Sequence, residues 1–326
     1  MTGKYELEIY NRRVHYHLTI SRNITIIQGN SATGKTELIR MISDYENNGN
    51  SSGITEICEK SCITLENSTW REKLKNHSGC IAFADEGSNF LTTQEFAEAV
   101  KNSDHYFVLV TREDLVQLPY SIKEIYGMRL DREKQKYNIP KKIYNELYQL
   151  YGVENEKENQ MKDFSIDTII TEDSNSGFDF FQDVWKNKCI SAKGKSNILT
   201  CIRKCETESI LAVVNGAAFG PEMQKVMRYI RDSSKRIWLY APESFEYLLL
   251  KADILPYTSK VTEKTYNYAD SRKYFSWEEF YTDYLVKISV GTIYQYSKKK
   301  LKEEYLTAGN KKKILEQLPE RLKEQI

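Results

Sequence analysis

Residues 23–36 read NITIIQGNSATGKT, a short β-branched run that leads into a glycine-rich turn. The run at Asn23–Gln28 is typical of a buried strand. Apolar side chains at helical spacing follow the turn over Glu37–Tyr45, so a strand, a tight turn and a helix are expected in succession. The same alternation recurs along the chain and favours an α/β fold, with helices covering a parallel sheet.

The turn has the pattern G-x-x-x-x-G-K-[ST] of a phosphate-binding loop, or P-loop. Every fixed position is filled in Gly29-Asn30-Ser31-Ala32-Thr33-Gly34-Lys35-Thr36. The glycines let consecutive backbone amides point inward at a helix N-terminus, where they bind an anion. Lys35 would reach the β- and γ-phosphates of a nucleotide, and the Thr36 hydroxyl would ligate Mg²⁺. The chain has no N/T-K-x-D motif of the GTPase kind, so ATP is the expected nucleotide.

A second apolar run ends in two carboxylates that suit the same chemistry. Cys80–Ala84 is followed by Asp85 and Glu86. This resembles the Walker B element of those P-loop NTPases that carry an extra catalytic glutamate. The resemblance implies that Asp85 holds Mg²⁺ through water and that Glu86, as the general base, polarises the attacking water.

A third apolar run, Tyr106–Thr111, is also expected to be a strand and is followed by Arg112. In such folds this strand would lie beside the one that carries the P-loop. Thr111 or Arg112 would then sense the γ-phosphate. The alternative, a polar strand end on the surface, stays open.

The resemblance to P-loop ATPases covers roughly residues 1–130. Two expected strands before the P-loop, Tyr5–Tyr10 and Val14–Ile20, form a hairpin. This hairpin resembles the ABC-type ATPases of the overcoming-lysogenization-defect and SMC-like groups. However, the gap between the two Walker elements is too short for an inserted helical subdomain, and no LSGG-like signature occurs. The compact spacing is more similar to AAA+ ATPases, so the branch stays open.

The second half of the chain more faintly resembles a TOPRIM domain. That fold places a glutamate after its first strand and an Asp-x-Asp after a later one. Here Glu172 and Asp173 follow the expected strand Thr168–Thr171, whereas Asn215 and Ala217 stand where the metal-binding aspartates would be. Because hard divalent cations favour anionic oxygen ligands, the resemblance implies a domain that has lost nuclease activity.

A TOPRIM-like domain without nuclease activity would still bind a nucleic acid or a protein partner. Lys193, Lys195, Arg203 and Lys204 would then be its phosphate contacts. A generic α/β domain unrelated to TOPRIM is the alternative. We therefore expect a P-loop ATPase domain, a linker, a TOPRIM-like α/β domain and a helical C-terminal segment, at residues 1–150, 151–163, 164–270 and 271–326 respectively.

Composition narrows the function classes. Of 326 residues, 47 are Lys or Arg and 46 are Asp or Glu, so bulk charge does not indicate a nucleic-acid partner.

Lys298–Lys302 and Lys311–Lys313 are expected on a solvated helix face. His15 and His17 alternate along a strand and are expected on one face of it, as ordinary strand residues. The six cysteines form no CxxC pair, which predicts reduced thiols.

The chain has no secretory leader and no apolar run of the roughly 20 residues that span a bilayer. A cytoplasmic protein without a membrane partner is therefore expected. The leading functional hypothesis is a Mg²⁺-dependent ATPase that acts as a switch on a nucleic-acid or protein partner. By analogy, this arrangement resembles bacterial anti-phage and mobile-element proteins. An ATP-regulated nuclease and a non-catalytic nucleotide-binding module are the alternatives, and oligomerisation stays open.

Overall fold

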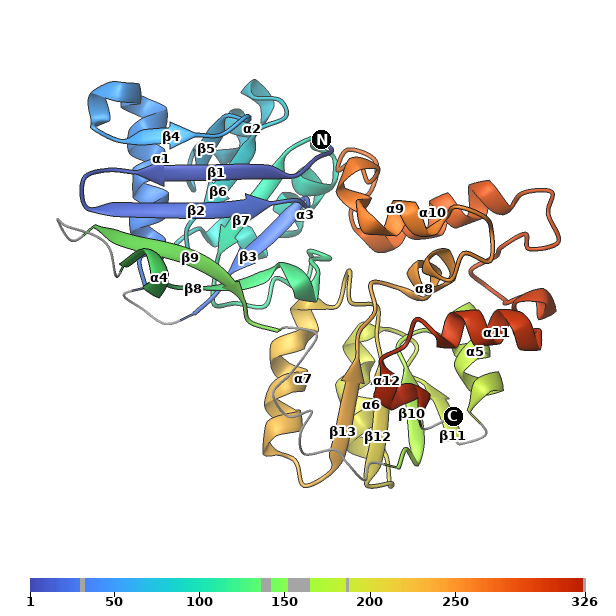
Figure 1. Ribbon diagram of the computed structural model, residues 1–326. Coiled ribbons are helices and arrows are strands. Elements are labelled where there is room, and N and C mark those ends of the chain that lie inside the picture. The colour runs from blue at the N-terminus through green and yellow to red at the C-terminus, as the bar shows by residue number, and fades with distance from the viewer. Residues whose placement is uncertain (30–32, 136–141, 152–164, 186–187, 325–326) are drawn as a thin grey trace. The chain divides into compact units, whose positions relative to one another are not determined.

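The computed structural model describes residues 1–29, 33–135, 142–151, 165–185 and 188–324 (Figure 1). The chain divides into two compact units. Unit 1 comprises Met1–Val153 and Tyr266–Phe275, and unit 2 comprises Glu154–Thr265 and Ser276–Ile326. The linker expected at 151–163 lies, except for Tyr151, outside the described residues.

Unit 1 is built on one mixed sheet of nine strands, in the order β4-β1-β2-β9-β8-β3-β7-β6-β5. The five strands from β8 to β5 in this order are parallel to one another, while β9 is antiparallel to β8 and β1 is antiparallel to both β2 and β4. The strands are β1 Tyr5–Tyr10, β2 Val14–Ile20, β3 Ile24–Ile27, β4 Thr55–Ile57, β5 Cys62–Leu65, β6 Ile81–Ala84, β7 Tyr106–Val110, β8 Ile125–Leu130 and β9 Ile143–Gln149.

The expected hairpin is therefore confirmed, and it belongs to the same sheet as the parallel strands, which makes that sheet mixed. Strand β9 joins the hairpin to the parallel strands, because it pairs with β2 on one side and with β8 on the other. On β2, His15 and His17 share the face opposite the core, as expected, and lie beside Glu8 and Glu6 respectively.

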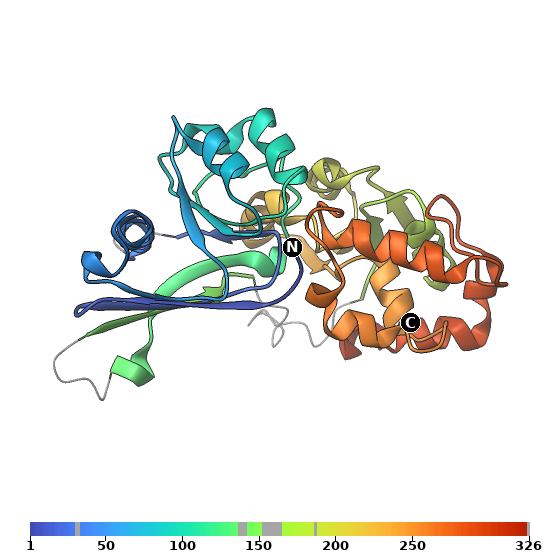
Figure 2. The same ribbon diagram turned by 90° about the horizontal axis from the view of Figure 1, so that it is seen from above.

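The sheet curls around helix α1. The chain passes from β4 to β5, the two edge strands of the sheet, through only the residues Cys58–Ser61. Since so short a connection spans at most about 18 Å, the two edges meet there. Helix α1 packs against β1, β4 and β5, and Figure 2 shows it end-on. The unit 1 helices are α1 Lys35–Asn48, α2 Trp70–Asn76, α3 Gln94–Lys101 and α4 Arg132–Gln135.

The core of unit 1 follows the sequence pattern closely. On α1 the apolar side chains of Leu38, Met41 and Ile42 are fully buried in one cluster with strand residues. This is the spacing that puts side chains on one helix face. On α3, the Thr93 hydroxyl accepts a hydrogen bond from the backbone N–H of Phe96 and so caps the helix N-terminus.

A short segment late in the chain belongs to unit 1. The backbone of Tyr266 accepts a hydrogen bond from Gly3, and Ser271 donates one to the carbonyl of Met1. The terminal amine of Met1 also forms an ion pair with Asp270. This segment, Tyr266–Phe275, therefore lies with the N-terminal strand. The boundary expected at residue 270 does not coincide with it.

Unit 2 contains a four-stranded, entirely parallel sheet in the order β11-β10-β12-β13. The strands are β10 Thr168–Thr171, β11 Lys188–Ser191, β12 Ser209–Val213 and β13 Arg236–Tyr240. The helices are α5 Ser176–Val184, α6 Ile198–Lys204, α7 Gly220–Asp232, α8 Phe245–Lys251, α9 Ser259–Glu263, α10 Trp277–Ser289, α11 Ala308–Leu315 and α12 Glu320–Lys323.

The C-terminal part of unit 2 is less helical than expected. Residues 290–302 between α10 and the next helical turn form no helix, so Lys298–Lys302 does not lie on a helix face. Among the helices that the structure describes, none is long and apolar enough to cross a membrane.

Candidate functional site

The candidate site of unit 1 lies at the carboxyl ends of three neighbouring parallel strands. In the register of the sheet, Ile27 of β3 is opposite Val110 of β7, and Ala84 of β6 is opposite Leu109. The three strands therefore end level with one another. Three groups of residues follow these strand ends at the same edge of the sheet: the P-loop, the pair Asp85-Glu86 and the pair Thr111-Arg112. The pairing of β7 with β3 confirms the expected place of β7.

Lys35 is the buried cation of the site. It is the first residue of α1 and is only 6% exposed. Its Nζ donates hydrogen bonds to the carbonyl of Gly29 at 2.9 Å and to Oγ1 of Thr33 at 3.1 Å. Burial lowers the pKa of Lys35, while the negative charges of Glu86 and Asp85 oppose this shift. The carboxylates expected to act with Lys35 are thus close enough to influence it.

The described part of the loop has the backbone that its glycines allow. Gly29 and Gly34 have φ values of +126° and +94°, which residues with a Cβ rarely adopt. Residues Asn30, Ser31 and Ala32 lie outside the described residues. Thr36 follows Lys35 in the first turn of α1, with an exposed side chain.

Tyr16 of β2 supports the end of the loop and was not expected from the sequence. Its hydroxyl donates a hydrogen bond to the carbonyl of Gly34 at 2.9 Å. A Cβ added to Gly34 would lie 3.0 Å from the same hydroxyl. Nothing in the P-loop pattern points to this contact, because Tyr16 comes from the hairpin that precedes the motif.

Glu86 and Arg112 form an ion pair, with Nε of Arg112 2.7 Å from Oε1 of Glu86. Both side chains remain accessible, at 52% exposure for Arg112 and 40% for Glu86. Thr111 is instead buried, and its Oγ1 accepts a hydrogen bond from the backbone N–H of Glu113 at 2.9 Å. Of the two candidates after β7, Arg112 is therefore the one that faces the general-base candidate.

The residues of this edge fit a magnesium-bound triphosphate. Lys35 and Arg112 supply positive charge for phosphate oxygens, and the N-terminus of a 14-residue helix adds its own. Asp85 and Thr36 supply the oxygen ligands that Mg²⁺ prefers. Within the described residues, no three His, Cys, Asp or Glu side chains are gathered in a way that could hold a metal ion by themselves. Magnesium here would instead need phosphate oxygens and water to complete its coordination.

In unit 2, Glu172 and Asn215 are brought together as the TOPRIM resemblance implies. They follow the adjacent strands β10 and β12, and the backbone N–H of Asn215 donates to Oε2 of Glu172 at 2.8 Å. Burial raises the pKa of Glu172 to about 7 and that of Asp173 to about 6. These three residues border a cavity of about 20 Å³, which has room for about one water molecule.

Glu278 and Lys298 join this cluster from distant parts of the chain. Glu278 lies in the first turn of α10 and accepts a hydrogen bond from Nδ2 of Asn215 at 3.2 Å. Lys298 pairs with the same carboxylate oxygen at 2.8 Å. No sequence pattern points to either residue here, and Lys298 was expected in solvent. Ala217 is buried and its backbone N–H donates to the carbonyl of Glu243.

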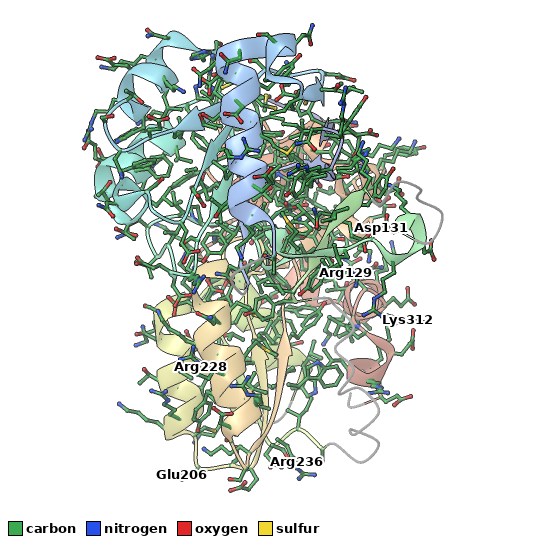
Figure 3. All side chains as sticks on the ribbon, turned by 90° about the vertical axis from the view of Figure 1, so that its left-hand side faces the viewer. Arg129, Asp131, Glu206, Arg228, Arg236 and Lys312 are labelled. Atoms are coloured by element: carbon green, nitrogen blue, oxygen red, sulfur yellow. The ribbon has the colours of Figure 1, made fainter. Side chains whose placement is uncertain are left out.

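The four basic residues proposed as phosphate contacts do not converge. Nζ of Lys195 donates to the carbonyl of Ala218 near the carboxyl edge of the sheet. Arg203 and Lys204 lie at the other end of helix α6, close in sequence to Glu206. Figure 3 shows Glu206 at the amino-terminal edge of the sheet, with Arg236. These four residues therefore do not form one basic cluster.

Another cavity of unit 1, of about 460 Å³, lies at different residues from the P-loop. Its lining includes Arg71 and Arg272, which form ion pairs with Glu95 and Asp104 respectively. Since each of these guanidinium groups already has a carboxylate partner, the cavity offers little to an anionic ligand.

Comparison with known proteins adds no family to this description. No protein-family model matches the chain, and no curated protein has a significantly similar sequence.

Proposed function

We propose that unit 1 binds ATP and hydrolyses it with Mg²⁺, as a switch that acts on a nucleic-acid or protein partner. One observation carries this proposal: Lys35, Asp85, Glu86 and Arg112 meet where three parallel strands end. In open α/β sheets, ligands bind outside the carboxyl ends of the strands, where the chain reverses its direction along the sheet. Among the parallel strands, β3 is such a point, because the next of them along the chain, β5, lies on one side of it and β8 lies on the other.

Each side chain has a distinct part in this chemistry. Lys35 and the amides at the start of α1 would bind the β- and γ-phosphates. Glu86 would orient the attacking water and accept its proton, and Arg112 would stabilise charge on the γ-phosphate. Bound Mg²⁺ would neutralise charge on the β- and γ-phosphates. Because Arg112 and Glu86 are paired in this structure, one movement of Arg112 toward the phosphate would also release the base.

The test is ATP turnover by the full chain in the presence and absence of Mg²⁺. Lys35→Ala is expected to abolish turnover and to weaken ATP binding. Lys101→Ala, which removes an exposed lysine at the end of α3, is the matched control and is expected to behave as wild type. A wild-type protein that binds ATP but never turns it over would favour the non-catalytic module. If Lys35→Ala changed neither binding nor turnover, the proposal would be wrong.

The partner is tested in the same assay by adding DNA, RNA or tRNA. A switch is expected to change its ATP turnover when its partner binds. We do not propose a nuclease, because Glu172 is already hydrogen-bonded to Asn215 and the charge of Glu278 is matched by Lys298. Metal-dependent cleavage of plasmid DNA that Glu172→Ala removes would reverse this conclusion.

A further inference from the structure

The connection between β4 and β5 holds two cysteines that the proposed ATPase chemistry does not use. Cys58 directly follows β4 and is half-buried, while Cys62 is the first residue of β5 and is only 5% exposed. Both pack on the apolar cluster that contains α1. Cys58 is thus the more accessible thiol of the pair, and Cys62 is the more protected one.

The surroundings of Cys58 favour its thiolate. Its side chain is close enough to that of Cys62, and to the backbone N–H groups of Lys60 and Glu59, for these groups to influence its titration. Their influence, with that of Cys62 the largest, lowers the pKa of the Cys58 thiol to about 7. The Cys62 thiol has the opposite character, because its proximity to Cys58 and its burial raise its pKa. Cys62 Sγ also lies 3.8 Å from the carbonyl of Lys60.

Glu56 provides a proton acceptor beside the pair. Burial raises the pKa of Glu56 to about 7, and the nearby Cys62 side chain opposes this shift. Its Oε2 atom is buried and has no hydrogen-bond partner among the described residues. A nucleophilic thiolate, a neighbouring protonated thiol and a carboxylate able to take up a proton therefore lie together in one turn.

We propose that Cys58 and Cys62 are a modification site that forms a reversible disulfide on reaction with a hydroperoxide. The Cys58 thiolate attacks the peroxide O–O bond, which gives Cys58 sulfenic acid and releases an alkoxide or hydroxide that takes up a proton. Cys62 then transfers its proton to Glu56 and attacks the Cys58 sulfur. The S–O bond breaks and water leaves. Overall, two thiols and one hydroperoxide give a disulfide, an alcohol or water, and water.

The position of the pair gives the disulfide a structural consequence. The residues Cys58–Ser61 join the two edge strands of the curled sheet. A disulfide between Cys58 and Cys62 would therefore restrict the short connection between β4 and β5, next to helix α1. A dithiol reductant would reduce this disulfide and restore both thiols.

The chain contains a matched control pair with the same spacing. Cys201 and Cys205 are also four residues apart, but they lie at helix α6. Cys205 Sγ contacts Oγ1 of Thr207 at 3.2 Å instead of a second thiol. Spacing alone would treat the two pairs alike, whereas the contacts around the sulfurs predict that only the first pair closes.

The experiment treats the reduced full chain with hydrogen peroxide, alkylates the remaining thiols and digests the protein with trypsin. Because trypsin cleaves after Lys60, a Cys58–Cys62 disulfide would link the peptides 41–60 and 61–71, whose joint mass is diagnostic. This linked species is expected to form and to disappear on reduction. Cleavage after Arg203 and Lys204 likewise separates Cys201 from Cys205, and these peptides are expected to stay unlinked and alkylated.

Two variants identify the roles of the thiols. Cys62→Ser is expected to leave Cys58 as a sulfenic acid that dimedone labels, and Cys58→Ser is expected to give neither label nor linkage. Circular dichroism checks that both variants fold, and the wild-type experiment stands without them. Absence of the 41–60/61–71 linkage in the folded wild type, or equal linkage of Cys201 with Cys205, would overturn the proposal.

Discussion

Both units place a glutamate and an aspartate side by side directly after a parallel strand, yet the two pairs have different surroundings. In unit 1, Glu86 follows β6, remains 40% exposed and faces Arg112. In unit 2, Glu172 follows β10, is half-buried and accepts a backbone hydrogen bond from Asn215. The same local pattern therefore leads to an accessible carboxylate in one unit and to a carboxyl group with a raised pKa in the other.

This comparison teaches that the chemistry of such a pair depends on what the fold puts opposite it. Exposed Glu86 lies near two cations, Lys35 and Arg112, at the edge of the sheet. Glu172 is surrounded by the carboxylates Asp173 and Glu278, which raise its pKa further. The first arrangement therefore sets two cations, Lys35 and Arg112, beside its carboxylate pair, whereas the second holds a carboxyl group with a raised pKa.

The largest expected effect separates the two glutamates by catalysis. Glu86→Gln keeps the size of the side chain but removes the proton acceptor, so kcat for ATP hydrolysis is expected to fall about 10²- to 10⁴-fold. ATP binding, measured by fluorescent-nucleotide titration, should be retained. Glu172→Gln is the matched control and is expected to leave turnover unchanged. Wild-type turnover by Glu86→Gln would remove the distinction between the two sites.

Much of unit 1 could be predicted because its central strands are fully buried. The runs at β6 and β7 are continuous apolar sequences with every residue buried, and the P-loop pattern is local. The missed strands β8 and β9 have no such signal. β8 contains Gly127, where an added Cβ would lie 2.5 Å from the ring of Tyr148 on β9. Their strand character comes from pairing with each other, which no local window contains.

In the site of unit 2, only the two residues that follow parallel strands could be predicted to lie together. Glu172 and Asn215 follow recognisable strands, so their proximity could be inferred from parallel pairing. Glu278 and Lys298 reach the cluster from α10 and from the loop after it, far along the chain. A lysine-rich run usually indicates a solvated surface, and the ion pair of Lys298 with Glu278 depends on a tertiary contact that the pattern does not reveal.

The second prediction concerns a structural carboxylate of unit 1. Glu124 is buried and pairs with buried Arg22 at 3.2 Å, and it also accepts a hydrogen bond from Oγ1 of Thr25. Glu124→Ala would leave a buried guanidinium without this partner, so the free energy of unfolding is expected to fall by about 3–5 kcal/mol. Chemical denaturation followed by circular dichroism measures it. Glu98→Ala, at an exposed position of α3, is the control. A loss of unfolding free energy in Glu124→Ala no greater than in this control would contradict the prediction.

The third prediction uses pH to test the buried carboxyl of unit 2. The pKa of Glu172 is raised from 4.5 to about 7 in the folded protein, so the folded state binds this proton more tightly than the unfolded state. The resulting stabilisation is complete below the unfolded pKa and is lost as pH rises through about 7. Because Gln resembles the protonated acid, Glu172→Gln should become more stable than wild type by about 1–3 kcal/mol between these limits.

Tryptophan fluorescence during chemical denaturation is suited to this measurement, since Trp185, Trp238 and Trp277 all belong to unit 2. The difference between Glu172→Gln and wild type is the informative quantity, because other groups with shifted pKa values, such as Glu56, are common to both proteins. A difference that stays constant between pH 4 and pH 8 would show that Glu172 titrates as an ordinary surface carboxylate.

The smallest expected effect on stability is at Arg112, and it contrasts two arginine–glutamate pairs of the same unit. The side chains of Arg22 and Glu124 are 7% and 5% exposed, whereas those of Arg112 and Glu86 are 52% and 40% exposed. An accessible ion pair gains little because water already solvates both charges. Arg112→Ala should therefore change the free energy of unfolding by no more than about 0.5 kcal/mol.

The same substitution should nevertheless slow ATP turnover, because we propose that Arg112 meets the γ-phosphate. Arg129→Ala is a suitable control, since Arg129 also forms an exposed ion pair in unit 1, with Glu146, but has no part in the proposed chemistry. Slower turnover with unchanged stability only in Arg112→Ala would assign that ion pair to function. Arg112→Ala could instead destabilise the fold as strongly as is expected for Glu124→Ala. The Arg112–Glu86 ion pair would then be structural, and movement of Arg112 toward the γ-phosphate could not be what releases Glu86.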